Sequence, residues 1–408
     1  MSKGKCLNKE INLKDKDDNL KLISSNINKN KENNLKESNS INIQNECKID
    51  CSNIVKKDKL ENNFIIAQIK VEKDKLNQRI INSYENIRKE EEDILDWDNI
   101  QGIENEEQIK SCAIFINNKK VDNNYYYNFP KEGIYVIKYI FKKCLIATNF
   151  MFYNCNSLIS VDLSNFFSKK VINMEYMFFN CKSLESINFS NFNTEKVTSM
   201  QCLFYSCVSL KSLDLSSFNT KNLVDMSFMF KICSSLAKIN LTTFKGQNVT
   251  TMRSTFCHCL SLKELDLSNF NSQNVINMSY LFYGCKSMIS LNISKFNTKN
   301  AVDMRFMFQD CKSLIRLDLS NFNTNNVTNM GSMFKGCNSL IELDISNFNT
   351  SNVNYITSMF KDCNSLVKLD IDEDKFKFGH ITDMGDIFEG CNSLIYKYIS
   401  SIEDKNSI

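Results

Sequence analysis

Apolar residues recur at a fixed interval along most of this chain. From about residue 145 onward, nine cysteines are evenly spaced at the interval that separates Cys155 from Cys181, and a tenth follows after an interval two positions longer. These cysteines are Cys155, Cys181, Cys207, Cys233, Cys259, Cys285, Cys311, Cys337, Cys363 and Cys391. A phenylalanine keeps the same spacing, from Phe152 to Phe388. A repeat of this length predicts one structural unit per period, with successive units stacked against one another.

The residues inside one repeat indicate how such a unit folds. Leu262, Leu265 and Leu267 have the spacing L-x-x-L-x-L, which is typical of leucine-rich repeats. The last two alternate, so both side chains lie on one face of a strand. Later in the repeat, Leu281 and Cys285 are four residues apart, a spacing that suits a short helical turn facing the core.

The sequence therefore predicts an α/β solenoid, a leucine-rich-repeat array of about ten coils with a parallel β-sheet and short helical turns. A single coil leaves its apolar face in water, so neighbouring coils must stack to bury it. Hydrophobic residues make up 42% of the chain, which is enough for a large core. Each large buried side chain contributes about 1.5–3 kcal/mol, so we expect the array to be stable without a cofactor.

Composition divides the chain into four parts. Residues 1–61 are rich in Asn, Lys, Ser and Asp and contain no aromatic residue. Such a segment buries too little apolar surface to fold, so we expect a disordered N-terminal tail. We expect a β-rich capping domain at 62–145, the solenoid at 146–400 and a C-terminal tail at 401–408.

Both ends of the array carry strand patterns. In the capping domain, β-branched and aromatic runs predict strands at Phe64–Val71 and Gly133–Phe141. We expect the second strand to form the first coil together with Leu145–Cys155, so that this region covers the open end of the array. At the other end, Ser393–Ser400 predicts a final strand, in which Lys397 replaces a leucine and marks an edge that faces water.

The phrase that repeats also resembles a known family. Met307–Met330 matches MFxxCxSLxxLDLSxFNTxxVTNM, which is similar to the repeat of BspA-like leucine-rich repeat proteins of bacterial surfaces, mycoplasma lipoproteins and protists. The resemblance extends over about residues 145–400, and residues 62–145 resemble the leader segment of some protist members. It implies a solenoid that binds other molecules, often as a cell-surface adhesin, and it carries over no catalytic residue.

Charge and hydropathy narrow the classes of partner. The 50 basic and 47 acidic side chains give a net charge of +3, which does not indicate a nucleic acid or an acidic membrane. No apolar run approaches the roughly 18 residues of a membrane span, and no secretory signal is visible. We therefore expect a cytoplasmic protein with a protein partner, and the alternative is a cell-surface adhesin that arrives by an unconventional route. Glycosylation motifs at Asn188 and Asn277 lie inside predicted strands or returns, where glycans would prevent stacking.

Candidate chemistry is sparse. The chain has two histidines, His258 and His380, and neither a Gly-rich phosphate loop nor a carboxylate pair outside the repeats. We expect no enzyme, no catalytic residue and no cofactor, and we disfavour a small-molecule ligand; the alternative is an unrecognised enzyme site within 62–145. The repeated cysteines fill slots too small for leucine, and Cys257 beside His258 has no matching Cys/His pair, so we predict no metal site.

Columns that vary between repeats are the candidates for recognition, because the constant columns are needed for packing. On the strands, residues between the inward leucines point outward and form two polar columns. The candidates there are Glu264, Asp266, Arg316, Asp318, Glu342 and Asp344. We expect this surface to bind a polar protein face or a cation; the alternative is a face that only interacts with solvent.

Aromatic residues form a second pair of varying columns, on either side of the Met-Phe pair. The candidates are Tyr153, Phe179, Tyr205 and Tyr283 after the pair, and Tyr176, Phe228, Tyr280 and Phe306 before it. We expect an exposed aromatic strip over the first coils that binds a partner, since exposed aromatic residues tend to mark interfaces. The alternative is that the rings only cover one another laterally.

Overall fold

The computed structural model describes residues 63–92, 100, 102–379 and 381–394. Several predictions concern residues outside these ranges: the tail at 1–61, the C-terminal tail at 401–408, His380, and the final strand with Lys397. The array itself is described almost throughout.

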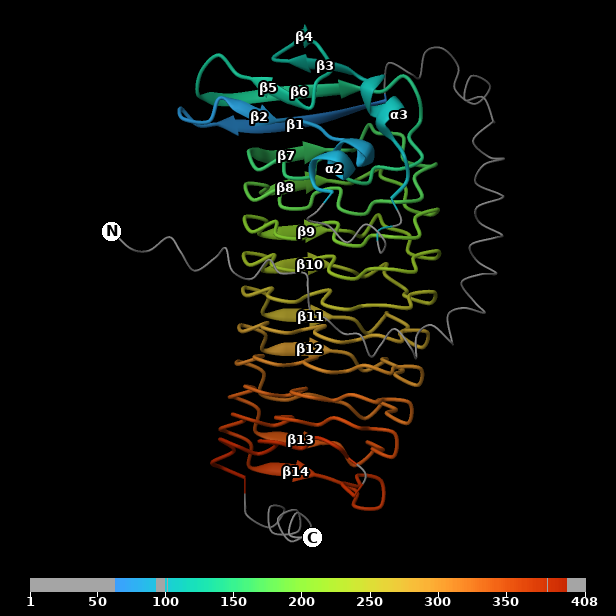
Figure 1. Ribbon diagram of the computed structural model, residues 1–408, viewed down its shortest axis with the longest axis vertical. Coiled ribbons are helices and arrows are strands. Elements are labelled where there is room, and N and C mark those ends of the chain that lie inside the picture. The colour runs from blue at the N-terminus through green and yellow to red at the C-terminus, as the bar shows by residue number, and fades with distance from the viewer. Residues whose placement is uncertain (1–62, 93–99, 101, 380, 395–408) are drawn as a thin grey trace. The chain divides into compact units, whose positions relative to one another are not determined.

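The strands of the array stack in parallel, one per coil, as Figure 1 shows from β7 to β14. Each strand pairs with the equivalent strand of an adjacent coil; Leu265 of β11, for example, lies opposite Leu291 of β12. The strands are β7 (Leu158–Asp162), β8 (Ser186–Asn188), β9 (Ser212–Asp214), β10 (Lys238–Asn240), β11 (Glu264–Asp266), β12 (Ser290–Asn292), β13 (Glu342–Asp344) and β14 (Lys368–Asp370). Within the described array, the coil of Leu317 has a buried leucine in the same place but no strand of its own. The predicted leucine-rich-repeat solenoid is confirmed.

A second ladder runs along the array and is more continuous than the strands. Single parallel bridges connect equivalent residues of adjacent coils, beginning Ala147 to Asn173 and ending Tyr355 to Asp383, and together they join ten coils. Beyond each bridge, in the segment we call the return leg, alternate N–H groups donate to the next coil. In the coil of Leu281, Tyr280 N donates to Arg305 O at 3.0 Å, and Phe282 N donates to Met307 O at 2.9 Å. Four such bonds recur at every step.

The return leg differs in one detail from the expected helical turn. It consists of consecutive tight turns, such as Tyr283 N to Tyr280 O at 3.1 Å. Two residues per coil have left-handed backbone, in this coil Tyr280 (φ 58°) and Gly284 (φ 71°). With these two left-handed residues four positions apart, alternate N–H groups of the return leg point toward the next coil and not toward their own. A helix would have used those groups internally.

The core consists of columns of identical side chains, with the phenylalanines stacked. Phe282 and Phe308 have ring centroids 5.6 Å apart and planes 17° apart. The cysteine column is buried and also forms hydrogen bonds. From Cys181 to Cys391, each Sγ donates to the carbonyl oxygen of a phenylalanine in the preceding coil. The nine distances lie between 2.9 and 3.3 Å. The column therefore combines a small volume with a donor that satisfies a buried carbonyl.

The N-terminal region continues the sheet of the array. Its elements are β1 (Phe64–Val71), β2 (Asn77–Arg79), α2 (Tyr84–Glu90), α3 (Glu106–Lys110), β3 (Ala113–Ile116), β4 (Lys119–Val121), β5 (Tyr126–Asn128) and β6 (Gly133–Ile140). The sheet has the order β4-β3-β6-β1-β7-β8. No helix in the described residues is both long and apolar enough to cross a lipid bilayer.

The expectation that Gly133–Phe141 forms the strand of the first coil is wrong. β1 lies between β6 and β7 and pairs antiparallel with both, with Ala67 opposite Ile137 on one side and Val161 on the other. β1 suits this central place because it buries alternate residues on one face, among them Ile65 and Ile69. Proximity along the chain favoured β6, but β6 pairs with β3 and β1 instead.

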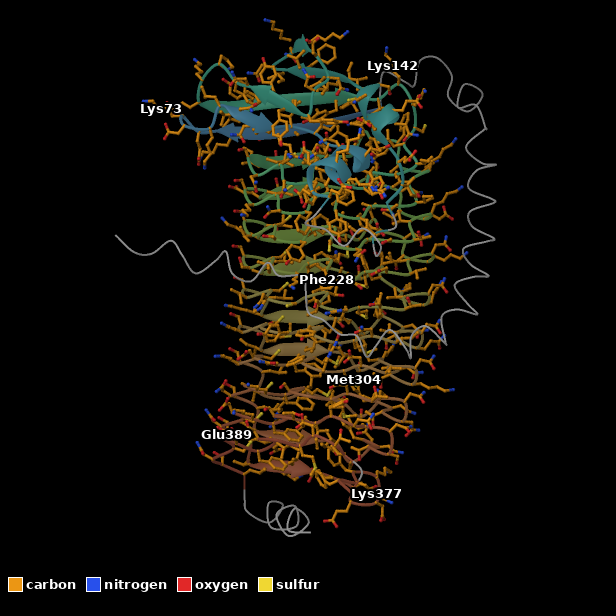
Figure 2. All side chains as sticks on the ribbon, in the orientation of Figure 1. Lys73, Lys142, Phe228, Met304, Lys377 and Glu389 are labelled. Carbon is orange, nitrogen blue, oxygen red and sulfur yellow. The ribbon has the colours of Figure 1, made fainter. Side chains whose placement is uncertain are left out.

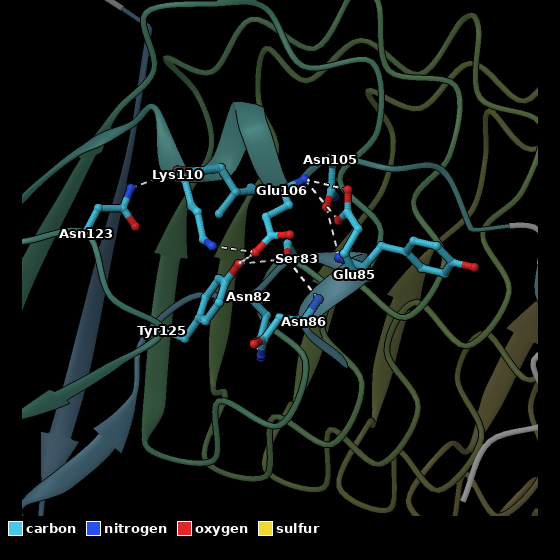
Figure 3. Close-up of polar contacts among 11 residues, drawn as sticks. Asn82, Ser83, Glu85, Asn86, Asn105, Glu106, Lys110, Asn123 and Tyr125 are labelled. Atoms are coloured by element: carbon cyan, nitrogen blue, oxygen red, sulfur yellow. Dashed lines mark hydrogen bonds and ion pairs between the residues drawn. The ribbon is translucent and has the colours of Figure 1, made fainter. Parts of the chain in front are cut away.

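Buried amides attach α2 and α3 to the first coil. Asn82 Nδ2 donates to Tyr153 O, and Asn105 Nδ2 donates to Asn149 O, both at 2.9 Å. Figure 3 shows the polar contacts around them, in which Tyr125 Oη lies 2.9 Å from Ser83 Oγ and donates to Glu106 Oε1 at 2.8 Å. These contacts connect α2, α3 and the segment of Tyr125, which indicates an anchoring network.

The left-handed backbone at Ile232 predicts how substitutions there change stability, because this residue has φ 62° and a β-branched side chain. We expect Ile232→Gly to be more stable toward urea than Ile232→Ala by about 1 kcal/mol, since a residue without Cβ avoids the steric penalty. The same two substitutions at Ile276, which is not left-handed, should give the opposite order because glycine loses more entropy on folding. Equal stability of the two Ile232 variants would contradict the backbone assignment.

Candidate interaction surfaces

The strand face consists of the residues that point outward from β7–β14. Glu264 and Asp266 are exposed on either side of the buried Leu265. The parallel register aligns this pair with the equivalent residues of the other coils, so all six strand candidates lie on one surface. They are Glu264, Asp266, Arg316, Asp318, Glu342 and Asp344, and all are exposed.

One of the two strand columns has a structural role that the sequence analysis missed. The Oδ1 atoms of Asp266, Asp318 and Asp344 accept the N–H of the serine two residues later, at 2.8, 3.0 and 2.9 Å. These backbone bonds hold the pKa values of Asp318 and Asp344 below the usual range. The recurring D-x-S pattern is the signal for this turn. The aspartate column of the strand face therefore has a role in holding the turn of each coil.

The aromatic face consists of the two columns that flank the Met-Phe pair. Six of the eight candidates are half-buried, with part of each ring at the surface: Phe179, Tyr205, Phe228, Tyr280, Tyr283 and Phe306. Tyr153 and Tyr176 are only 2% and 8% exposed, so the expectation of exposure is wrong for these two. The anchoring network holds the N-terminal region against the first coil, where Tyr84 packs on Phe150 at 5.7 Å.

Stacking along the array determines which part of a ring is exposed to solvent. Tyr153 and Phe179 are 4.9 Å apart with planes at 9°, and Phe179 and Tyr205 are 4.7 Å apart at 21°. Tyr280 and Phe306 form a second stack at 4.6 Å and 22°. In these stacks the ring faces cover one another, which leaves ring edges for the surface, whereas Tyr283 meets Tyr280 edge-on at 5.8 Å. The lateral covering considered from the sequence therefore occurs together with partial exposure.

Two cations lie between these stacks. Lys231 Nζ is 5.6 Å from the ring centroid of Tyr205 and 5.4 Å from that of Phe228. The Arg253 guanidinium is 5.6 Å from Phe228 and 6.0 Å from Tyr280. Figure 2 places Phe228 midway along the array. Arg253 lies in the coil in which Ser254 and Cys257 replace both rings, and Lys231 replaces the ring of the second column in the preceding coil. The face is therefore a series of rings and positive charges.

Arg253 could not be identified as a residue of the aromatic face from the sequence. It lies outside both aromatic columns, one position before the column of Phe228 and Tyr280. Other residues of that third column include Glu175, Gln201 and Arg305, which share no charge or side-chain type. Only the register of the coils places its guanidinium beside the rings.

A buried carboxyl lies at the N-terminal end of the aromatic face. Glu175 is 2% exposed, and burial raises the pKa of its carboxyl to about 7, with a smaller contribution from the negative charge of Asp225. Hydrogen bonds from Ser199 and Asn173 act in the opposite direction. Burial also raises the pKa of Asp225. Desolvation therefore dominates the electrostatics at this end.

The thiols and the one described histidine have packing roles. Burial raises the pKa values of Cys233, Cys257 and Cys337 to about 12, which makes them poor nucleophiles. The His258 ring packs edge-on against Tyr283, with centroids 4.8 Å apart. In the part of the chain that the structure describes, no three His, Cys, Asp or Glu side chains are grouped as metal ligands. The surfaces are suited to binding through ring edges and charge.

The raised pKa of Glu175 predicts a pH dependence of stability. As pH rises from 4.5 to about 7, the unfolded chain loses the proton of this group before the folded chain does, so the folded state loses stability. We expect Glu175→Gln to increase the free energy of unfolding at pH 8 by on the order of 3 kcal/mol, with little change at pH 4. Urea titrations at several pH values measure this, with the exposed Glu185→Gln as control. Parallel pH profiles of Glu175→Gln and the unsubstituted protein would contradict the assignment.

Comparison with solved structures finds similar leucine-rich-repeat proteins of low identity. A leucine-rich repeat protein from Bacteroides ovatus is 19% identical over 67% of this chain and 71% of that chain, with a TM-score of 0.35. A leucine rich cell surface protein from Faecalibacterium prausnitzii is 17% identical over 60% and 73%, with a TM-score of 0.29. A leucine-rich repeat protein from Eubacterium ventriosum is 17% identical over 59% of each chain, with a TM-score of 0.27. No curated protein matches the chain.

A known protein family matches this chain along the whole array. Residues 146–256, 233–317 and 288–402 each match a family described as Mycoplasma protein of unknown function, DUF285. The three matches overlap and cover the whole array, in the same residues that carry the BspA-like phrase. Since they include more than half of the chain, the protein belongs to the DUF285 family.

Proposed function

We propose that the protein is a non-enzymatic scaffold that binds another protein through its aromatic face, between Phe179 and Phe306. The observation that carries this proposal is the series of half-buried rings and cations along six neighbouring coils. Aromatic residues and arginine are the side chains that contribute most to protein interfaces. Rigid stacked rings lose little conformational entropy when a partner binds.

The ring orientation favours a protein over a nucleic acid or a sugar. Single-stranded nucleic acids bind when bases stack on exposed ring faces. Here the faces of Tyr205 and Tyr280 are occupied by neighbouring rings and cations. The outward edges suit contact with aliphatic and aromatic side chains, and Lys231 and Arg253 favour carboxylates. The partner we propose therefore presents an apolar surface that also carries acidic residues.

We place this interaction inside the cell. Glycosylation motifs support this location, since Asn277 lies in the bridge ladder between Thr251 and Asp303, where a glycan would crowd the adjacent coils. The alternative, an adhesin at the cell surface, is tested by biotinylation of intact cells. Labelling of the protein by a reagent that does not cross membranes would favour the adhesin.

Charge reversal tests the proposed surface with little disturbance of the fold. We expect Lys231→Glu together with Arg253→Glu to weaken partner capture at least 10-fold, a loss of about 1.4 kcal/mol or more. The matched control reverses two lysines of the strand face, Lys238→Glu and Lys263→Glu, and should retain the partner. The measurement is affinity capture from lysates of the source cells with quantitation of the same bound protein, after unfolding curves show that all variants are folded. Equal loss in both variants, or in neither, would reject the aromatic face as the binding site.

A further inference from the structure

Four aliphatic side chains form an exposed ridge in consecutive coils near the C-terminal end of the strand face. These residues are Ile289, Ile315, Ile341 and Val367, which are 51%, 43%, 42% and 43% exposed. Each follows a fully buried Met or Leu, so the core of its coil is already filled; Leu314 and Leu340, for example, are completely buried. Neighbouring parallel strands are about 4.8 Å apart, so the ridge is about 14 Å long. An exposed row of this kind tends to mark an interaction site.

The ridge is confined to these coils. In the five preceding coils the same column contains Ile159, Glu185, Lys211, Ala237 and Lys263. The repeat therefore tolerates charged residues at this position, and stacking of the coils does not require an aliphatic side chain there. What the aliphatic residues contribute must come from a contact outside the coil.

Charges beside the ridge are arranged symmetrically about its midpoint. Arg316 directly follows Ile315, and Glu342 directly follows Ile341, in adjacent coils. Both side chains are exposed, and within residues 102–379 no ion pair joins them. Rotation by 180° about an axis that runs along the strands, between these two coils, exchanges the positive position with the negative one. The surface is therefore complementary to itself.

We propose that the ridge is the centre of a homodimer in which two copies of this chain pack antiparallel about that axis. Ile315 of each copy then faces Ile341 of the other, and Ile289 faces Val367. The same rotation places Arg316 opposite Glu342 twice in each dimer. Two ridges of four aliphatic residues form the apolar centre, and the two ion pairs fix its register.

The charges decide between this arrangement and a parallel one. An axis along the array would place each coil opposite the same coil of the other copy, so Arg316 and Glu342, which lie in adjacent coils, would not face each other. The antiparallel dimer also has two unfavourable contacts, because Asp318 of each copy faces Asp344 of the other. Together with the short ridge, this repulsion predicts a weak dimer whose population depends on concentration.

Sedimentation velocity of the full chain over a range of concentrations tests the dimer. We expect a reversible equilibrium between monomer and dimer, and we expect Ile315→Glu to raise the dissociation constant at least 10-fold. Val224→Glu is the matched control, since Val224 is an exposed aliphatic residue outside the ridge, and it should leave the equilibrium unchanged. A protein that remains monomeric up to about 200 µM, where even a Kd of ~100 µM would give a visible dimer, would overturn the proposal. A dimer that Ile315→Glu does not weaken would overturn it equally.

Charge exchange tests the antiparallel register directly. Arg316→Glu and Glu342→Arg should each raise the dissociation constant at least 10-fold, because each single variant places like charges opposite one another twice. A mixture of the two single variants should regain the original affinity as a heterodimer, since both contacts then join opposite charges. The double variant should also dimerise on its own. If the mixture dimerises no better than either variant alone, the proposed pairing is wrong.

Discussion

Backbone hydrogen bonds between return legs are the interaction on which the rest of this structure depends. Four N–H groups per coil donate to the next coil at every step, whereas the strands pair only two by two. Two left-handed residues in each return leg make this possible, because they interrupt a local helix and leave alternate peptide groups directed along the array. Register is then fixed at one repeat per coil, and identical side chains must lie above one another.

This register also determines what the surface can do. Rings in the same column of adjacent coils are held about 5 Å apart, so they stack and expose their edges. Where a ring is absent, a cation from another column occupies the space, as Arg253 does between Phe228 and Tyr280. Surface chemistry in such an array depends on several columns together.

The columns that repeat in every coil could be predicted from the sequence. The strand pairing of the N-terminal region and the burial of Tyr153 and Tyr176 could not. The period of Cys and Phe was sufficient for the solenoid, because each repeat faces the same environment. The place of β1 could not be read from periodicity, since it depends on which of several strands with similar patterns pairs with β7. Burial of Tyr153 and Tyr176 follows in part from the contacts of Asn82 and Tyr84, which lie in a segment outside the repeat. The division into domains and the binding roles of both faces stay predictions.

The antiparallel pairing of β1 with β7 limits where further coils can be added to the array. A coil extends the solenoid only through a parallel neighbour in the same register, and the outer edge of β7 is already occupied by a strand of opposite direction. Whole repeats gained by gene duplication can therefore be accommodated only downstream of β7. Changes in the number of repeats would alter the reach of the protein on one side and leave the N-terminal end unchanged.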